Sequence, residues 1–306
     1  MIAPIAGGWI VENPKLSWRW TEYVTLIISL FAFLIALLFL PETHLPTLLK
    51  WKAAHLRELT GNDRYQPEDD EGSFLDQMKS VGSLPVKFWL TEPVVAIFGI
   101  YLVLLYILLF SFLSGFDYIF KKTYDLSPGY TGSCFGASAL GATAFTLLAP
   151  GLYTAAREKT EHVRKRPLSP EFRLWPAIIA GPLLSAALFC LGWTARPDIT
   201  IWSPLAACFV FGGCLCAIYV STYEYIIDSY GESSSIALAS ITFVRYLVAG
   251  AMAIAARPMF MNIGVPWTMT GLGIVAAILS PAPFVFWWIG GTLRNKSPYA
   301  AGDDER

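Results

Sequence analysis

Long runs of residues without a single charge constrain this chain more than any other feature of its sequence. A helix needs about 20 apolar residues to cross a bilayer. Six runs of about that length or more contain no Asp, Glu, Lys or Arg: 23–41, 93–116, 126–156, 174–195, 199–223 and 258–293. A seventh, 236–256, is interrupted only by Arg245. Because 55% of the residues are apolar or aromatic and only 15% are charged, a soluble core could not hide this much apolar surface. We predict an all-α membrane protein.

The spans and the basic residues together predict an orientation. We expect a partial helix at the start of the chain, followed by spans at 22–41, 93–115, 130–153, 174–195, 201–223, 236–257 and 267–289. Fifteen of the 22 Lys and Arg residues then fall on one side of the membrane, six fall on the other, and Arg245 lies within a span. Cytoplasmic loops keep basic residues, so the C-terminal tail, 290–306, is predicted to be cytoplasmic. The sequon at Asn295 should therefore remain unmodified.

The longest loop, 42–92, is predicted to be a cytoplasmic linker rather than a domain. Between Leu45 and Leu59, leucines recur at roughly helical spacing with basic residues between them. This pattern favours an amphipathic helix lying on the inner leaflet, and the alternative is an ordinary solvated linker helix. The stretch 66–72 is acidic, lacks apolar residues and is predicted to be disordered.

Several function classes find no support in the composition or the motifs. A net charge of -1 gives no reason to expect nucleic acid as a partner. The five cysteines lie in apolar stretches without the spaced Cys or His partners of a metal site. Phosphate-binding loops of the Walker type, HExxH and GxSxG motifs are all absent from the sequence. We therefore predict no enzyme activity, no catalytic residues, no metal and no cofactor.

Arg245 is the most informative single residue. It lies about 14 Å into its predicted helix, which is too deep for its charged end to reach the membrane surface easily. Its guanidinium must face protein or a water-filled cavity. One interpretation is contact with a substrate, a proton-carrying carboxylate or a gate, and the other is a purely structural tie.

Glu224 and Asp228 are the acidic candidates that the sequence places near Arg245. They follow the preceding predicted span and lie one helical turn apart, so they share a helix face. Their pKa would change if an arginine partner came and went, which makes them candidates for proton coupling or gating. A charged pair that merely solvates a helix end is the alternative.

Aromatic side chains recur at helical spacing in two predicted spans, with one acid beside them. They are Tyr106, Phe110, Tyr118 and the neighbouring Asp117 in one span, and Tyr219 and Tyr223 in the other. Aromatic walls with a few polar groups suit large, partly apolar and often cationic ligands, so we take these residues as substrate-pathway candidates. Ordinary packing is the alternative for each of them. Glycines such as those at 132 and 136 permit close helix contacts.

Four short blocks carry a resemblance to a known family. The block Pro4-Ile5-Ala6-Gly7-Gly8 resembles the end of the antiporter motif, P-x-x-G-G, in helix five of drug:proton antiporters of the major facilitator superfamily. Three further blocks, starting at Trp18, Leu40 and Tyr225, resemble fungal members of the 12-helix group, which includes multidrug, polyamine and toxin exporters. The blocks occur in the family's order and together cover nearly the whole chain.

The resemblance implies a domain organisation. Residues 1–41 would be the end of the N-terminal bundle, comprising part of helix five and helix six, and 42–92 the central linker. Residues 93–289 would be the C-terminal six-helix bundle. Pro4, Gly7 and Gly8 would be a remnant of the antiporter motif. Helices one to four would be missing, so that the chain looks truncated at its N-terminus.

The resemblance also implies a function. The complete carrier would export small amphipathic or cationic compounds, such as drugs, polyamines or secondary metabolites, by proton antiport at the plasma membrane. Its partners would be the lipid bilayer, a small-molecule substrate, protons, and a missing N-terminal bundle or a full-length carrier. This chain alone is predicted to be inactive, because one bundle has no second bundle to rock against. The alternative is a non-transporting half-subunit or scaffold that docks to a full-length carrier.

Overall fold

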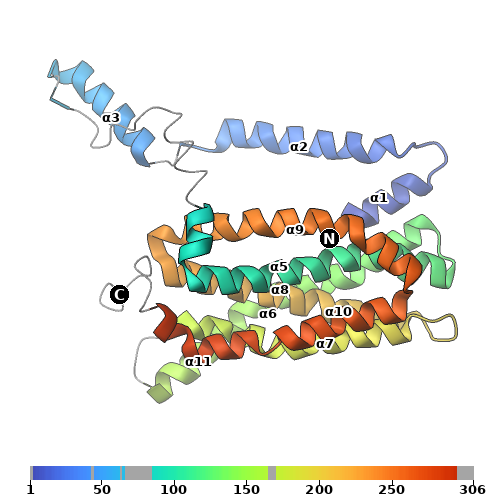
Figure 1. Ribbon diagram of the computed structural model, residues 1–306. Coiled ribbons are helices and arrows are strands. Elements are labelled where there is room, and N and C mark those ends of the chain that lie inside the picture. The colour runs from blue at the N-terminus through green and yellow to red at the C-terminus, as the bar shows by residue number, and fades with distance from the viewer. Residues whose placement is uncertain (1–2, 43–44, 63, 66–84, 165–169, 295–306) are drawn as a thin grey trace. The chain divides into compact units, whose positions relative to one another are not determined.

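The computed structural model describes residues 3–42, 45–62, 64–65, 85–164 and 170–294 (Figure 1). The described residues contain no strand, and seven helical stretches are long and apolar enough to cross a membrane. These stretches are Arg19–Phe39, Pro93–Lys122, Pro128–Glu158, Pro170–Thr194, Trp202–Tyr230, Ser234–Asn262 and Val265–Thr292. They correspond one by one to the seven predicted spans and confirm an all-α membrane fold.

The chain divides into two compact units, Met1–Lys15 with Leu84–Arg306, and Leu16–Ser83. In the larger unit the α-helices are α1 (Ala3–Glu12), α5 (Pro93–Phe116), α6 (Pro128–Arg164), α7 (Trp175–Thr194), α8 (Trp202–Tyr230), α9 (Ser234–Asn262), α10 (Val265–Leu279) and α11 (Ala282–Arg294). Short helices connect some of them: the π-helix η1 (Asp117–Lys122) and the 3-10 helices η2 (Pro170–Leu174) and η3 (Gly231–Ser233). Residues 85–91 are also helical.

The larger unit is a bundle in which α8 packs against both α6 and α7, while α5 packs against α9 (Figure 1). Helix α10 packs against α7, and α1 packs against α6. Large aromatic side chains fill the space between these helices, and Phe98, Phe112 and Phe211 are almost fully buried. The rings of Phe112 and Phe211 lie 4.4 Å apart, centroid to centroid. Aromatic packing between α5 and α8 therefore holds the centre of the bundle together.

Two of the spans differ from the prediction, one at its end and one in its middle. Helix α8 continues past the apolar run to Tyr230 and ends at Gly231, whose φ of +48° suits glycine. Glu224 and Asp228 therefore lie on the helix itself. The last span is divided into α10 and α11 at Pro281, because a proline ring cannot continue the hydrogen-bond pattern of a helix.

Helix α1 approaches α6 closely through two glycines. A Cβ added to Gly8 would lie 2.6 Å from the carbonyl oxygen of Pro128, and one added to Gly132 would lie 2.5 Å from that of Pro4. At the same crossing, Trp9 donates a hydrogen bond to Ser133 with a length of 3.0 Å. The GxxxG spacing that begins at Gly132 thus serves a helix contact, and so do Pro4 and Gly8.

Polar contacts fix the end of this crossing. A carboxylate oxygen of Glu12 accepts hydrogen bonds from the backbone N–H of Gly129, at 2.7 Å, and from the Ser127 hydroxyl, at 2.9 Å. These donors lie at the start of α6, where backbone N–H groups have no partner within the helix. The acid at the end of α1 therefore caps α6.

The smaller unit holds the helices α2 (Arg19–Phe39) and α3 (Leu45–Thr60). No residue of α2 is buried, and an apolar helix of this length requires lipid or protein around it. Helix α3 covers the segment for which the sequence predicts an amphipathic helix, and its place on the inner leaflet stays a prediction. The acidic stretch 66–72 and most of the tail lie outside the described residues.

The α1–α6 crossing makes Gly8 and Gly7 a matched pair for mutation. Gly8→Ala should destabilise the bundle by about 1–3 kcal/mol, because the new methyl group meets backbone rather than a flexible side chain. Gly7→Ala should leave the stability unchanged or raise it by up to about 1 kcal/mol, since no atom of the described residues outside its own stretch of helix lies within 4 Å of the added Cβ. Thermal unfolding of both variants in detergent measures the difference, and equal melting temperatures would contradict the observed packing.

Candidate functional site

Arg245 lies inside a group of four tyrosines, Tyr106, Tyr219, Tyr223 and Tyr246, which we call the tyrosine cage. Its side chain is only 2% exposed. The central carbon of its guanidinium lies 4.2 Å from the ring centroid of Tyr106, 5.2 Å from that of Tyr246, and 5.5 and 5.6 Å from those of Tyr219 and Tyr223. Four aromatic faces thus stabilise one buried cation.

Among the described residues, the hydrogen bonds of Arg245 go only to neutral hydroxyl groups. One terminal nitrogen, Nη1, donates to Tyr223 at 2.6 Å and to Tyr219 at 3.4 Å, and Nη2 is 3.4 Å from the Thr242 hydroxyl. The third nitrogen, Nε, is buried and has no hydrogen-bond partner among the described residues. Within that part of the chain, Arg245 also forms no ion pair with an Asp or Glu.

Three helices supply the cage. Tyr106 comes from α5, Tyr219 and Tyr223 come from α8, and Arg245 comes from α9 with its neighbour Tyr246. The spacing of four residues places Tyr219 and Tyr223 on the same face of α8, where their rings stack with centroids 4.4 Å apart. Arg245 lies about 16 Å into a helix about 43 Å long, so the cage belongs to the middle part of α9.

The structure brings together four of the residues that the sequence singles out, namely Tyr106, Tyr219, Tyr223 and Arg245. Phe110 lies beside them, with its ring 5.9 Å from that of Tyr106. Sequence reasoning missed Tyr246 and Thr242. The position of Thr242, three residues before Arg245, is a signal that could have found it, since side chains three apart meet on a helix. Helical spacing gives no such signal for Tyr246, which directly follows Arg245.

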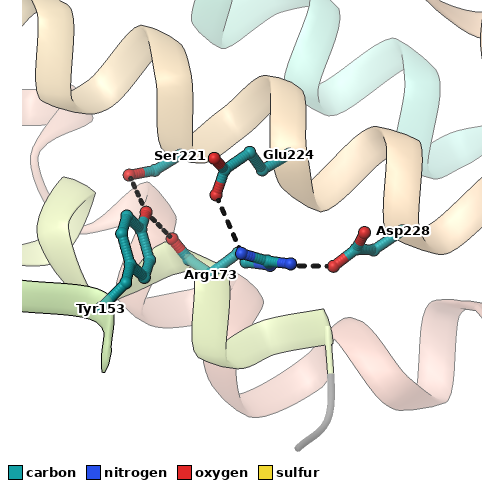
Figure 2. Close-up of polar contacts among 5 residues, drawn as sticks. All are labelled: Tyr153, Arg173, Ser221, Glu224 and Asp228. Atoms are coloured by element: carbon teal, nitrogen blue, oxygen red, sulfur yellow. Dashed lines mark hydrogen bonds and ion pairs between the residues drawn. The ribbon is translucent and has the colours of Figure 1, made fainter. Parts of the chain in front are cut away.

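A second polar group lies further along α8 and contains Arg173, Glu224 and Asp228 (Figure 2). Arg173 Nε donates to Asp228 at 2.9 Å, and Arg173 Nη1 lies 3.4 Å from Glu224. The Tyr153 hydroxyl is 3.3 Å from both the backbone carbonyl of Arg173 and the Ser221 hydroxyl. These contacts, which we call the Arg173 network, connect η2 with α8 and α6.

The Arg173 network gives the two predicted carboxylates a different partner from the expected one. Glu224 and Asp228 both bond Arg173, whereas Arg245 bonds tyrosines. The sequence analysis did not identify Arg173 as a partner of these acids, because it counted this residue only among the basic residues that set the orientation in the membrane. The extension of α8 to Tyr230 explains the outcome, since it carries both acids past the cage and alongside η2.

Asp117 and Tyr118 lie apart from both groups. They line a cleft of about 650 Å³ with Ser114, Lys121, Lys122, Asp125, Ala253 and Arg257. Tyr118 is twelve residues from Tyr106, which corresponds to about 18 Å along a helix. The six aromatic and acidic substrate-pathway candidates therefore lie at two separate sites rather than at one. Among the described residues, no group of His, Cys, Asp and Glu could hold a metal ion.

Comparison with known proteins supplies the class. The sequence profile of the Major Facilitator Superfamily matches residues 1–254. MFS-type transporter kojT of Aspergillus flavus is 38% identical over 301 residues, which cover 97% of this chain and 53% of kojT. The multidrug transporter FLU1 of Candida albicans is 33% identical over 308 residues, which cover 98% of this chain and 50% of FLU1. MFS-type transporter acdC of Aspergillus candidus is 31% identical over 311 residues, with coverage of 98% and 59%.

Seven apolar helices and these relatives define an integral multi-pass membrane protein of a transporter class. The chain belongs to the Major Facilitator Superfamily. It spans about half the length of the curated relatives that it matches. A lipid environment follows from the seven apolar helices of the described residues.

The Arg173 network predicts a measurable coupling between Arg173 and Asp228. The two side chains are 41% and 36% exposed, so we expect a coupling energy of about 0.5–1 kcal/mol in a double-mutant cycle of Arg173→Gln and Asp228→Asn. The cycle is measured by chemical unfolding in detergent. A parallel cycle that pairs Arg196→Gln with Asp228→Asn should be additive. Additivity in both cycles would show that the ion pair contributes nothing to stability.

Proposed function

We propose that this chain is the C-terminal half of a proton-coupled exporter of the fungal 12-helix drug:proton antiporter group, together with the end of the N-terminal half. In this proposal residues 1–41 complete the N-terminal bundle, 42–92 form the cytoplasmic linker, 93–289 form the C-terminal bundle and 290–306 form a cytoplasmic tail. The carrier lies in the plasma membrane and exports small amphipathic or cationic compounds such as drugs, polyamines or secondary metabolites.

The contact between α1 and α6 is the observation that carries this proposal. Pro4 and Gly8, which belong to the resemblance to the antiporter motif, are the residues at which α1 meets Pro128 and Gly132 of α6. In a complete carrier, α1 would end helix five of the first bundle and α6 would be the second helix of the other bundle. The motif would then form a contact about which the bundles move in alternating access.

The tyrosine cage would be the substrate site of the C-terminal bundle. Substrates of such carriers bind near the bilayer midplane between two bundles, and Arg245 lies in the middle part of α9. The cage offers aromatic faces for an amphipathic ligand and hydroxyl groups for orientation. Phe110 would extend its apolar wall, and Asp117 and Tyr118 would line the pathway at a second point.

The Arg173 network would couple proton uptake to the movement of the two bundles. A proton taken up by Glu224 or Asp228 removes the negative charge that holds Arg173, and the tie between η2 and α8 weakens. Glu224 directly follows Tyr223, so a shift of α8 moves a residue of the cage and a residue of the network together. This is a way for protonation at one end of α8 to change the substrate site.

A second candidate is a half-subunit or scaffold that does not transport and docks to a full-length carrier. Helix α2 supports this candidate, because none of its residues is buried within the described part of the chain and its apolar surface is open to another protein. Co-purification of the tagged 306-residue chain with a full-length carrier from its own cells would support docking, whereas recovery of the chain without a carrier would contradict it.

Efflux in liposomes tests the proposed export. The 306-residue chain by itself should release an amphipathic fluorescent dye at the rate of protein-free liposomes under an imposed pH gradient, because one bundle cannot alternate. The carrier encoded by the full-length message, read from the 5′ end of the transcript, should show efflux that stops when the gradient is collapsed. Robust efflux by the 306-residue chain, or none by the full carrier, would contradict the proposal.

A further inference from the structure

We propose that the tyrosine cage binds the negative group of a small, flat organic anion, such as an aromatic carboxylate, and that it disfavours cations. The inference rests on the proposed transport function and names the substrate class of that site. It narrows the range of amphipathic compounds that the sequence leaves open.

The charge of Arg245 has no counter-ion among the described residues. A guanidinium stays protonated under all ordinary conditions, and this one is 98% buried with only neutral hydroxyl partners in the described part of the chain. A buried charge without a counter-ion is costly. An anion placed beside the cage supplies the missing negative charge, whereas a cation adds a second positive charge to the same buried site.

The aromatic faces of the cage are already in contact with a cation, Arg245. The electron-rich face of a tyrosine ring attracts cations, which is why the sequence pattern alone suits cationic ligands. In the structure, however, Arg245 itself lies 4.2–5.6 Å from all four ring centroids. The attraction of these rings for a cation is therefore already used by the protein. What remains for a ligand is their apolar surface, which suits a flat ring.

The direction of the hydrogen bonds in the cage leaves hydroxyl protons that can be donated to a ligand. The oxygens of Tyr223 and Tyr219 accept from Arg245 Nη1, so their own O–H protons remain available as donors. The Tyr219 hydroxyl also interacts with those of Tyr223 and Tyr106, and three hydroxyls joined by two such bonds leave one proton to donate to a ligand. A hydroxyl that accepts from a cation becomes a stronger donor. The positive charge of Arg245 is thereby extended toward the half-buried Tyr223, where a ligand can reach it.

Three probes of one shape but different charge test the inference. Benzoate, benzylammonium and benzyl alcohol are titrated into the purified 306-residue chain in detergent, and their dissociation constants are measured by calorimetry. Benzoate should bind at least about tenfold more tightly than either of the others, as a charge-assisted hydrogen bond implies. Equal or tighter binding of benzylammonium, or no detectable binding of benzoate, overturns the inference.

Variants assign the binding to the cage. Arg245→Gln should weaken benzoate binding by about tenfold or more, while Arg196→Gln, which removes an exposed arginine outside the cage, should leave it unchanged. Tyr223→Phe keeps the ring and removes one hydroxyl, and it should weaken benzoate binding several-fold, with the exposed Tyr130→Phe as its control. If Arg245→Gln does not fold, as judged by gel filtration and thermal unfolding, Tyr223→Phe decides. Unchanged benzoate binding in the folded cage variants overturns the inference.

The two proposals fail in different ways. Benzoate binding that depends on Arg245, together with no efflux by the full carrier, would overturn the transport proposal and leave the anion site. Proton-driven efflux of cations, with no benzoate binding to the cage, would overturn the anion site and leave the exporter.

Discussion

A charged side chain within an apolar helix must find its partners in neighbouring helices, because lipid offers none. Arg245 meets this requirement by drawing together Tyr106 of α5 and Tyr219 and Tyr223 of α8 around α9. No carboxylate takes part in this cluster among the described residues. This one arrangement joins three helices around a buried positive charge.

Helix α8 contributes residues to the core, to the tyrosine cage and to the Arg173 network. Gly212 allows its backbone to approach Ser138 of α6 closely, and its aromatic residue Phe211 lies in the core. Tyr223 faces the cage, while the next residue, Glu224, bonds Arg173 in η2. One rigid helix thus carries both the groups that could hold a substrate and the groups that could take up a proton. Export and proton coupling remain proposals, and this shared helix is the physical reason for linking them.

Much of the fold follows from the sequence, because membrane helices must be long and apolar and must satisfy their own backbone. The seven spans, the position of Arg245 and the aromatic spacing on α8 were all predictable in this way. The partners of Glu224 and Asp228 were not, since they depend on how far α8 extends beyond its apolar run and on where η2 folds back. Likewise, nothing in the P-x-x-G-G block distinguishes Gly8, which meets backbone, from Gly7, which lies in open space. Local sequence patterns predict helices, whereas contacts between residues on distant helices can be learned only from how the helices pack.

The most direct test of the central claim is a crystal structure of the chain with bound 4-bromobenzoate, in which the anomalous signal of bromine locates the ligand. We predict a bromine peak beside the tyrosine cage, with the carboxylate within hydrogen-bond distance of Tyr223 or Arg245. We also expect Arg245 to remain among its tyrosines and Arg173 to remain bonded to Glu224 and Asp228. A ligand found only beside Lys121, Lys122 and Arg257, or an Arg245 side chain paired with a carboxylate of the protein, would contradict the proposed anion site.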